Sequence, residues 1–345
     1  MPSGDETLQN KRYSLTDKTA VVLVTYNDME YIQTCLESVY DNEPGEVVVV
    51  DNGSTDGTVD VIKNEFPETT LIQMDHNPGP GSANNRGVQE VDSEYVVILN
   101  TDTIIDSNLI HELVQPIAEN GPQITVPKIL TYNGNIINTI GNIIHFSGLA
   151  FTRGYGEPSD AYSETKQLTG ISGACFATTR ETYQEMCGFE DSMFIYMDDT
   201  ELSWKANALG IDILYIPTAI VYHDYQGIKL GSEKLYHLEI GRYIILRKYL
   251  TAKTLALIFP SLVITEILTW GYAVSQGLDG VKAKLKAISE GFSADVDTAG
   301  NNTQALLYQL DKRIPVEQLQ FPKVVKAGIE AANKLYELNH SLLKR

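Results

Sequence analysis

The first 128 residues alternate short apolar strands with helical patterns, and this alternation constrains the fold more than any other feature. From Thr19 onward, runs rich in valine and isoleucine are separated by segments whose apolar residues recur at helical spacing. Strands that alternate with helices predict βαβ units, and therefore a mostly parallel sheet covered by helices. We predict an α/β, doubly wound unit of the nucleotide-binding type.

The predicted strands are Ala20–Thr25, Glu46–Asp51, Thr70–Asp75, Tyr95–Asn100 and Gln123–Pro127. The predicted helices between and after them are Met29–Tyr40, Gly57–Glu65, Ser82–Gln89 and Asn108–Ala118. Turns rich in glycine, asparagine and threonine then predict hairpins and a flexible loop between Lys128 and Gly170. Beyond them we predict helices at Arg180–Met186 and Thr200–Leu209, and β-structure at Ile213–Ile216 and Ala219–His223.

The composition restricts the cellular compartment and the kinds of ligand that suit this chain. The three cysteines among 345 residues are widely separated, which argues against a disulfide framework and favours a reducing compartment. A net charge of −19 argues against general nucleic-acid binding, and an anionic ligand would need a local cation. Residues 1–17 are polar and lack the apolar core of a signal peptide, so we expect a disordered tail.

The segment Thr254–Leu278 is strongly apolar, and Glu266 divides it into two uncharged runs that are each too short to span a bilayer. Nine basic and five acidic residues lie between His223 and Ala287, so this stretch is positive within an acidic chain. An apolar helix pair with basic flanks favours contact with a membrane surface, and a core helix is the alternative. The helical stripe in Val324–Leu343 predicts packing on the body or self-association into an oligomer.

Polar residues end the predicted strands. The strand Tyr95–Asn100 runs into Thr101 and Asp102, and a carboxylate at the carboxyl end of a central strand is well placed to hold a divalent cation against a phosphate. The first strand ends in Thr25, Tyr26 and Asn27, which can line a nucleotide pocket, although most first strands end in some polar turn.

Two further segments carry ligand-binding chemistry of the same kind. Asp51 ends the second strand before a Gly/Ser turn and can accept hydrogen bonds from a base or ribose. The loop Asn77–Gly87 contains Gly79, which permits close approach of a ligand, and Arg86, which either meets a phosphate or lies on the solvated surface.

An acidic cluster follows, in which Asp198, Asp199 and Glu201 lie within four residues. Mutual repulsion raises the pKa of at least one of these carboxyls, which suits a general base, whereas an acidic helix N-terminus is the structural alternative. His223 ends a later strand and is a candidate metal ligand.

Together these segments resemble the family 2 glycosyltransferases with the GT-A fold, particularly their rhamnosyltransferase-like branch. The match runs in order from about Ala20 to Tyr249 through V-V-L-V-T-Y-N, V-D-N-G-S-T-D-G-T, N-P-G-P-G-S-A-N-N-R-G, L-N-T-D-T, S-G-A-C-F and G-F-E. The resemblance implies a Rossmann-like, mostly parallel sheet over residues 18–250. A helical, membrane-associated C-terminal region would follow over residues 251–345.

The resemblance also implies roles for single residues. It places on the nucleotide-sugar donor Thr25, Tyr26, Asn27, Asp51, Asn77, Gly79, Arg86, Asn100 and Thr101. Asp102 and His223 would hold Mg²⁺ or Mn²⁺, with Asn100 at the first position of the D-x-D motif and therefore one charged ligand fewer. Asp199 would be the catalytic base in the family's E-D-x-D pattern, with Asp198 and Glu201 on the acceptor side.

The implied reaction is an inverting single displacement onto a hydroxyl of a glycan or a lipid-linked acceptor. The metal would bridge an acidic protein and an anionic donor. The implied location is cytoplasmic and peripheral on the inner face of the cell membrane. Two alternatives remain. A nucleotidyltransferase usually has a glycine-rich basic loop after the first strand, which Thr25-Tyr26-Asn27-Asp28 lacks, and a non-catalytic binding protein would not need Asp102, Asp199 and His223 together.

Overall fold

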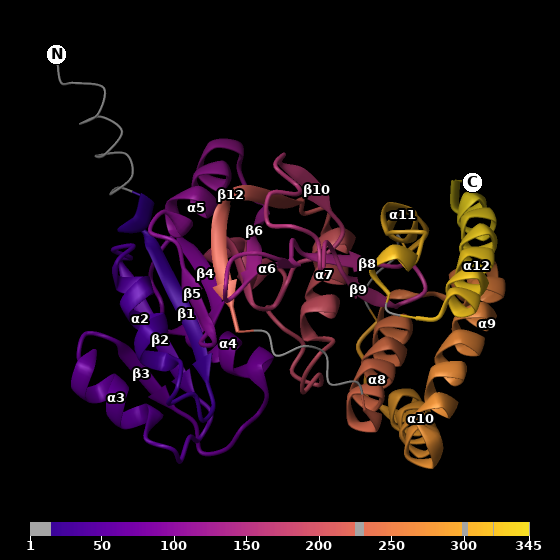
Figure 1. Ribbon diagram of the computed structural model, residues 1–345, viewed down its shortest axis with the longest axis horizontal. Helices are drawn as coiled ribbons and strands as arrows, with labels where there is room; N and C mark the ends of the chain where they lie inside the picture. Colours follow the sequence, from indigo (N-terminus) through magenta and orange to yellow (C-terminus); the bar gives the residue numbers. More distant parts are fainter. Residues whose placement is uncertain (1–14, 225–230, 299–302, 320, 345) are drawn as a thin grey trace.

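The computed structural model describes residues 15–224, 231–298, 303–319 and 321–344. An α/β unit, indigo to magenta in Figure 1, lies beside a group of helices drawn in orange and yellow. Residues 1–14 of the expected disordered tail lie outside the described residues. Leu15, which fell within that expected tail, is buried in the hydrophobic core.

A ten-stranded sheet forms the centre of the α/β unit, in the order β10–β12–β6–β11–β4–β1–β2–β3, with β5 beside β12 and β7 beside β6. Its strands are β1 (Thr19–Thr25), β2 (Glu46–Asp51), β3 (Thr70–Gln73), β4 (Tyr95–Asn100), β5 (Thr103–Ile105), β6 (Ile124–Thr131), β7 (Ile137–Thr139), β10 (Lys166–Leu168), β11 (Cys175–Thr179) and β12 (Ile213–His223). The pairings make β1, β2, β3, β4, β6 and β12 run in one direction, and the other four strands run against them. The predicted α/β class with a mostly parallel sheet is confirmed.

Helices cover both faces of the sheet because the side chains of the central strands alternate between two cores. Val21 and Leu23 of β1 point into one core, and Ala20 and Val22 point into the other. The helices of the α/β unit are α2 (Ile32–Tyr40), α3 (Thr58–Glu65), α4 (Pro80–Gln89), α5 (Leu109–Asn120), α6 (Arg180–Glu185) and α7 (Asp198–Leu209). The first core takes apolar residues from α2, α3 and α5, and the second takes them from α4, α6 and α7.

The second half of the unit differs from the sequence prediction in three places. The segment Cys175–Thr179 is strand β11, inserted antiparallel between β4 and β6, where no strand was predicted. The two predicted pieces of β-structure, Ile213–Ile216 and Ala219–His223, are one strand, β12, whose register shifts between Ile216 and Ile220. Pro217 lies at this irregularity, where a residue without a backbone N–H is tolerated. The predicted hairpins are represented by β8 (Asn142–Ile144) and β9 (Ala150–Thr152), which pair with each other.

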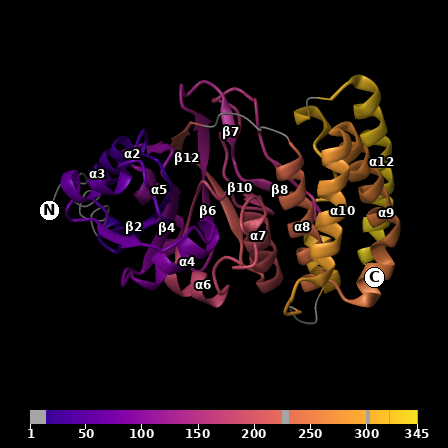
Figure 2. The same cartoon turned by 90° about the horizontal axis from the view of Figure 1, so that it is seen from below.

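The C-terminal residues form a group of helices that we call the helical layer: α8 (Ser232–Tyr249), α9 (Ala252–Ser275), α10 (Gly277–Ser293), α11 (Thr303–Gln309) and α12 (Lys323–Ser341). Short 3₁₀ turns lie at Val316–Gln318 and Leu342–Lys344. Figure 2 shows α8, α10, α9 and α12 standing side by side next to α7. A third apolar core joins them to the α/β unit through residues such as Trp204 and Phe146.

The prediction of two apolar helices separated at Glu266 is wrong, because α9 runs unbroken through that position. Glu266 forms ion pairs with Arg242 of α8 and with Lys284 of α10, so its charge is neutralised inside the helical layer. Among the described residues, α9 is long and apolar enough to cross a membrane by length and composition.

Candidate active site

The carboxyl ends of β1, β2, β4 and β12 lie along one edge of the sheet, which we call the sheet edge. Ligands of open α/β sheets bind at this edge. Thr25, Asp51, Asn100 and His223 are the last residues of these four strands. The parallel arrangement therefore gathers residues that are up to about two hundred positions apart in the sequence.

Asp28 connects two of the loops at the sheet edge. Its Oδ2 accepts hydrogen bonds from Thr25 Oγ1 at 3.0 Å, the Tyr26 backbone N–H at 3.1 Å and Thr101 Oγ1 at 2.6 Å. Its own N–H donates to Thr58 Oγ1 at 3.0 Å. Sequence reasoning missed Asp28 as a site residue, although an aspartate shortly after a polar strand end is a common turn-forming signal.

The loops after β1 and β2 are joined through Asn27. This residue has a left-handed backbone with φ 59°, its N–H donates to Ser54 Oγ at 2.8 Å, and its Oδ1 accepts from the Thr55 N–H at 2.8 Å. Asp51 is buried and accepts from the N–H groups of Gly53 at 3.3 Å and Ser54 at 3.1 Å. These carboxylate bonds shape the turn, and the expected nucleoside contact of Asp51 stays a prediction.

The loop after β3 is held at the same edge. Asn77 Oδ1 accepts from the Gly79 N–H at 2.9 Å and from Asn52 Nδ2 at 3.3 Å. Gly79 has φ 96°, and a Cβ at this position would lie 2.4 Å from the carbonyl oxygen of Phe194. Only glycine therefore allows the loop to approach the segment that precedes α7.

Arg86 lies apart from the other predicted donor-binding residues. It is in the last turn of α4, and its guanidinium pairs with Glu90 on the exposed side of that helix. The backbone N–H of Asp92, just after this helix, donates to Glu46 at the first residue of β2. Since that residue marks the opposite edge of the sheet, we leave Arg86 out of the site proposed below.

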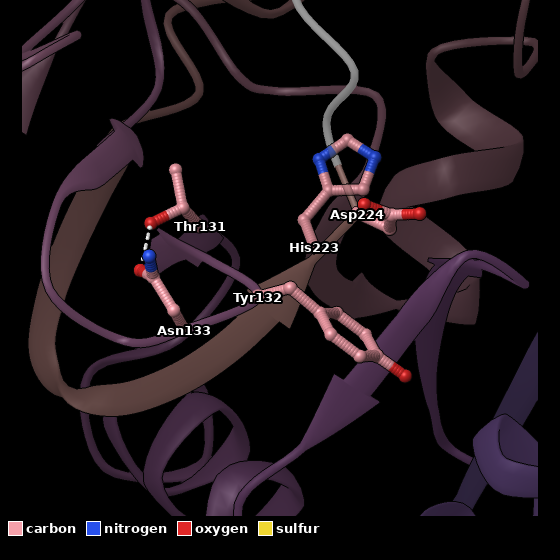
Figure 3. A pocket seen from close by; sticks show the side chains of 5 residues that line it. All are labelled: Thr131, Tyr132, Asn133, His223 and Asp224. Carbon is pink, nitrogen blue, oxygen red and sulfur yellow. Dashed lines mark hydrogen bonds between the residues drawn. The ribbon is translucent and has the colours of Figure 1, made fainter.

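Asp102 and His223 meet at the sheet edge. Strand β5 pairs Thr103 with His223, and the Asp224 N–H donates to the Asp102 carbonyl oxygen at 3.0 Å. The two side chains are 3.2 Å apart, from His223 Nε2 to Asp102 Oδ2. His223 also lines a cavity of about 350 Å³ with Asp224, Thr131, Tyr132 and Asn133 (Figure 3).

Asn138 of β7 orients this histidine. It is buried, and its Oδ1 lies 3.0 Å from His223 Nδ1. An amide oxygen can only accept, so a neutral His223 that donates from Nδ1 to Asn138 would direct the lone pair of Nε2 toward a cation shared with Asp102. Sequence reasoning missed Asn138, because it lies in the stretch that was predicted to be hairpins and a flexible loop.

The donor set at Asp102 and His223 suits a divalent cation. Carboxylate oxygen and imidazole nitrogen are ligands for Mn²⁺, and adjacent ligands of an octahedral ion with bonds of about 2.1 Å lie about 3 Å apart. The observed separation of 3.2 Å matches that spacing. Among the described residues no group of three or more His, Cys, Asp or Glu side chains could hold a metal. The diphosphate of a substrate would have to supply further oxygens, as is usual for Mg²⁺.

Asp199 lies in the first turn of α7 and is held by uncharged donors. Its Oδ2 accepts from Asn142 Nδ2 at 2.8 Å and from the Gly173 N–H at 3.2 Å. The residue after Gly173, Ala174, accepts at its carbonyl oxygen from the Asn100 N–H at 2.9 Å. This short path ties Asp199 to the end of β4, immediately before Asp102.

Both carboxyls at the start of α7 have raised pKa values. Burial is the main cause for Asp198, and repulsion from Asp199 adds to it, so the pKa of Asp198 is raised. Burial also raises the pKa of Asp199, and the bonds from Gly173, Thr200 and Asn142 only partly oppose this rise. Two adjacent acids that resist ionisation suit proton transfer at near-neutral pH.

Glu201 differs from the prediction that it lies on the acceptor side. Its side chain is fully buried, and it forms ion pairs with Lys205 at 3.2 Å and Lys248 at 2.8 Å. Tyr249 donates to its Oε1 at 2.8 Å. Glu201 therefore attaches α7 to α8 of the helical layer and does not face a substrate.

Comparison with known proteins shows which sequences and folds this chain is similar to. Residues 20–187 match the sequence model of Glycosyl transferase family 2. The poly-beta-1,6-N-acetyl-D-glucosamine synthase of Staphylococcus epidermidis is 26% identical over 79% of the chain and 67% of the relative. The N-acetylglucosaminyl-diphospho-decaprenol L-rhamnosyltransferase of Mycobacterium tuberculosis is 25% identical over 65% of the chain and 81% of the relative. The chain thus spans about two thirds of the length of the synthase.

Solved structures share the fold. GalNAc-T7 with UDP, GalNAc and Mn²⁺ superposes with a TM-score of 0.57 at 18% identity, over 80% of this chain and 56% of that one. Residues 1–349 of S. aureus TarS in complex with UDP-GlcNAc give a TM-score of 0.54 at 16% identity, over 94% of this chain and 90% of that one. The predicted GT-A fold is confirmed.

Proposed function

We propose that this chain, a glycosyltransferase that carries a family 2 domain over residues 20–187, transfers a sugar by metal-dependent inversion at the anomeric carbon. The donor would be a nucleotide-sugar, and the acceptor would be a hydroxyl of a glycan or of a lipid-linked sugar. Because both curated relatives are named for N-acetylglucosamine-containing products or acceptors, we propose an acceptor that ends in N-acetylglucosamine.

The donor would lie on the loops at the sheet edge. Thr25, Tyr26 and Asn27 follow β1, and the bonds of Asp28 hold this loop against Thr101. Asp51, Asn77 and Gly79 complete the line of predicted donor residues at the ends of β2 and β3. Tyr26 is half exposed there and is available to pack against a base.

Asp102 and His223 would hold the divalent cation, with Asn138 orienting the histidine. A cation bound there supplies charge stabilisation to the diphosphate leaving group. Asn100 takes the first place of the D-x-D motif, so its amide contributes no charge, and the metal would depend on the donor's phosphates for most of its ligands.

Asp199 would take the proton from the acceptor hydroxyl as that oxygen attacks the donor sugar. The observation that carries this proposal is the connection from Asp199 through Gly173 and Ala174 to the end of β4. This connection supports a role for Asp199 beside the Asn100-Thr101-Asp102 segment, since its hydrogen bonds come from uncharged donors. A raised pKa makes Asp199 a stronger proton acceptor than an ordinary carboxylate.

A screen of nucleotide-sugars tests the proposed function. We expect one donor to release nucleoside diphosphate when Mn²⁺ or Mg²⁺ is present, more rapidly with methyl N-acetyl-β-D-glucosaminide, and chelation with EDTA should stop the release. Release of pyrophosphate from a nucleoside triphosphate and a sugar phosphate would instead show a nucleotidyltransferase. Donor binding without turnover would show a binding protein.

The helical layer would contact the cytoplasmic face of a membrane. One side of α9 exposes Phe259, Val263, Ile267 and Val274, which recur at helical spacing and are unpartnered among the described residues. Lys253 is exposed at the start of the same helix. An apolar face beside a basic residue suits an anionic lipid surface.

Flotation with vesicles that contain phosphatidylglycerol tests this contact. The wild-type protein should float, and the double substitution Phe259→Ser and Ile267→Ser should reduce the floated fraction. The matched control, Leu335→Ser with Leu338→Ser, removes two exposed leucines from α12 and should leave flotation intact. A wild-type protein that stays at the bottom of the gradient would contradict membrane contact and would leave the enzymatic proposal untouched.

A further inference from the structure

The segment that leads into α7 exposes two aromatic rings immediately before the acidic pair. Phe194 is 46% exposed and Tyr196 is 42% exposed. Met193 and Met197 on either side are buried in the core shared with the helical layer. The segment is therefore anchored by its methionines while its two rings are turned outward.

The backbone at Tyr196, which carries one of the two exposed rings, has an unusual conformation. Tyr196 has φ 75°, a left-handed conformation that is uncommon for a residue with a bulky side chain. The neighbouring Met197 packs directly on α8, since a Cβ added to Gly241 would lie only 2.5 Å from the Met197 Cβ and glycine alone allows this approach. Strain of this kind concentrates at functional sites, where the surrounding packing maintains it.

Two side chains of α8 complete the cluster. The Lys234 ammonium lies 4.6 Å from the centre of the Tyr196 ring. The His237 ring lies 6.0 Å from the Phe194 ring and 6.2 Å from the Tyr196 ring, between centroids. We call Phe194, Tyr196, Lys234 and His237 the aromatic platform.

The aromatic platform adjoins both halves of the candidate active site. The Phe194 carbonyl oxygen packs against Gly79 of the proposed donor loop. Burial lowers the pKa of Lys234, and the nearby Asp199 carboxylate opposes this shift. The platform thus lies where a molecule would reach Asp199 on one side and the donor on the other.

We propose that the aromatic platform is the acceptor subsite and that it binds a sugar ring of the acceptor, stacked on Phe194 and Tyr196. This inference rests on the proposed function. Aromatic faces carry partial negative charge and attract the polarised C–H groups on the face of a sugar ring. Lys234, which lies over one face of the Tyr196 ring, and His237 beside both rings supply hydrogen-bond donors, which hydroxyl groups of a sugar can use and an alkyl chain cannot.

Saturation-transfer NMR with methyl N-acetyl-β-D-glucosaminide tests the subsite without any turnover. The wild-type protein should transfer saturation to the protons of the sugar ring. The variant Tyr196→Asn should lose most of this signal, and asparagine is chosen because it tolerates a left-handed backbone. The matched control Tyr308→Asn removes a ring that is 41% exposed on α11, and it should leave the signal unchanged.

Kinetics with the donor found in the screen give a second measurement. Loss of one stacked ring should raise the acceptor KM about 3- to 10-fold in Tyr196→Asn, with a smaller change in kcat and an unchanged donor Kd. A general folding defect would weaken donor binding as well. An unchanged acceptor KM together with an unchanged NMR signal would overturn the subsite. With an octyl glycoside as a second probe, a wild-type signal confined to its alkyl chain would also overturn it. If no donor turns over, the proposed function fails while the NMR result stands by itself.

Discussion

Two pairs of acidic residues lie in different surroundings. Asp198 and Asp199 are at the start of α7, whereas Glu239 and Glu266 are in the helical layer. In the helical layer, Arg242 and Lys284 each pair with both glutamates. Burial alone would raise the pKa of Glu266, but the two cations outweigh it and hold that pKa below its usual value. At α7, no cation among the described residues forms an ion pair with Asp199, and burial raises its pKa.

The neighbours of each acid decide whether it stabilises the fold or can take part in proton transfer. An acid that is neutralised by a cation joins two helices and cannot accept a proton at ordinary pH. An acid that is bonded only to uncharged donors keeps its position and remains able to bind a proton. Glu201 illustrates the rule, because it lies two residues from Asp199 but pairs with Lys205 and Lys248.

The substitution Asp199→Asn should have the largest effect on activity. It keeps the shape of the side chain but removes the proton acceptor, so we expect kcat to fall about a hundred- to ten-thousand-fold. The donor Kd, measured by calorimetry with Mn²⁺, should change little because the donor loops do not depend on this carboxylate. Turnover near the wild-type value would mean that Asp199 is not the base.

The substitution Lys284→Met should have the largest effect on stability. Lys284 is fully buried and contacts Glu239, Glu266 at 3.1 Å and Thr269 at 2.8 Å. Its removal leaves the buried Glu239 and the half-buried Glu266 with Arg242 as their remaining cation among the described residues, which we expect to cost about 3 kcal/mol of the free energy of unfolding.

Urea denaturation measures this cost, and an exposed ion pair serves as the control. Arg313 pairs with Glu330 at 2.8 Å and Glu337 at 3.1 Å on the surface. Arg313→Met should change the free energy of unfolding by about 1 kcal/mol or less. Equal effects of the two substitutions would show that the buried network does not hold the helical layer together.

The strand ends of the site were predictable from the sequence because a polar residue that follows an apolar strand must lie at the sheet edge. Asp102 and His223 were identified in this way, and the structure brings them together. Asn138, Asn142 and Gly173 were not, since they come from two short strands and a loop whose path depends on tertiary pairing.

Errors in the prediction also have physical causes. The break predicted in α9 at Glu266 failed because the neutralising cations belong to α8 and α10, and a single segment does not reveal its partners. The donor contact predicted for Arg86 stays a prediction, and the structure shows this residue paired with Glu90 in the last turn of α4. Glu201 was counted with Asp199 because sequence spacing does not report burial.

The substitution Asn138→Leu should weaken metal binding at Asp102 and His223. It removes the amide oxygen that fixes His223 Nδ1, so the imidazole loses its orientation, and we expect Mn²⁺ affinity to fall about 10- to 100-fold. Calorimetric titration of Mn²⁺ in the presence of donor measures this change. Asn135→Leu, an exposed position of the same segment, is the control and should leave the affinity unaltered. Equal affinity in both variants would mean that Asn138 does not support a metal ligand.

The smallest expected effect is a displacement of the pH profile, and it tests whether the acids of α7 are truly unpaired. A base must be deprotonated to accept a proton, so kcat should fall as the pH falls through the raised pKa of Asp199. This acidic limb should lie above the pKa of about 3.9 that is usual for aspartate. Repulsion from Asp199 raises the pKa of Asp198, and because repulsion between two carboxylates is mutual, we expect Asp198→Asn to move the limb to lower pH. Asp60→Asn removes the same charge from the exposed side of α3 and should not move the limb.

Two outcomes would contradict this prediction. A limb that stays in place in both variants would show that Asp199 and Asp198 do not titrate as a coupled pair. A wild-type limb near the usual aspartate pKa would show that Asp199 is neutralised like the acids of the helical layer.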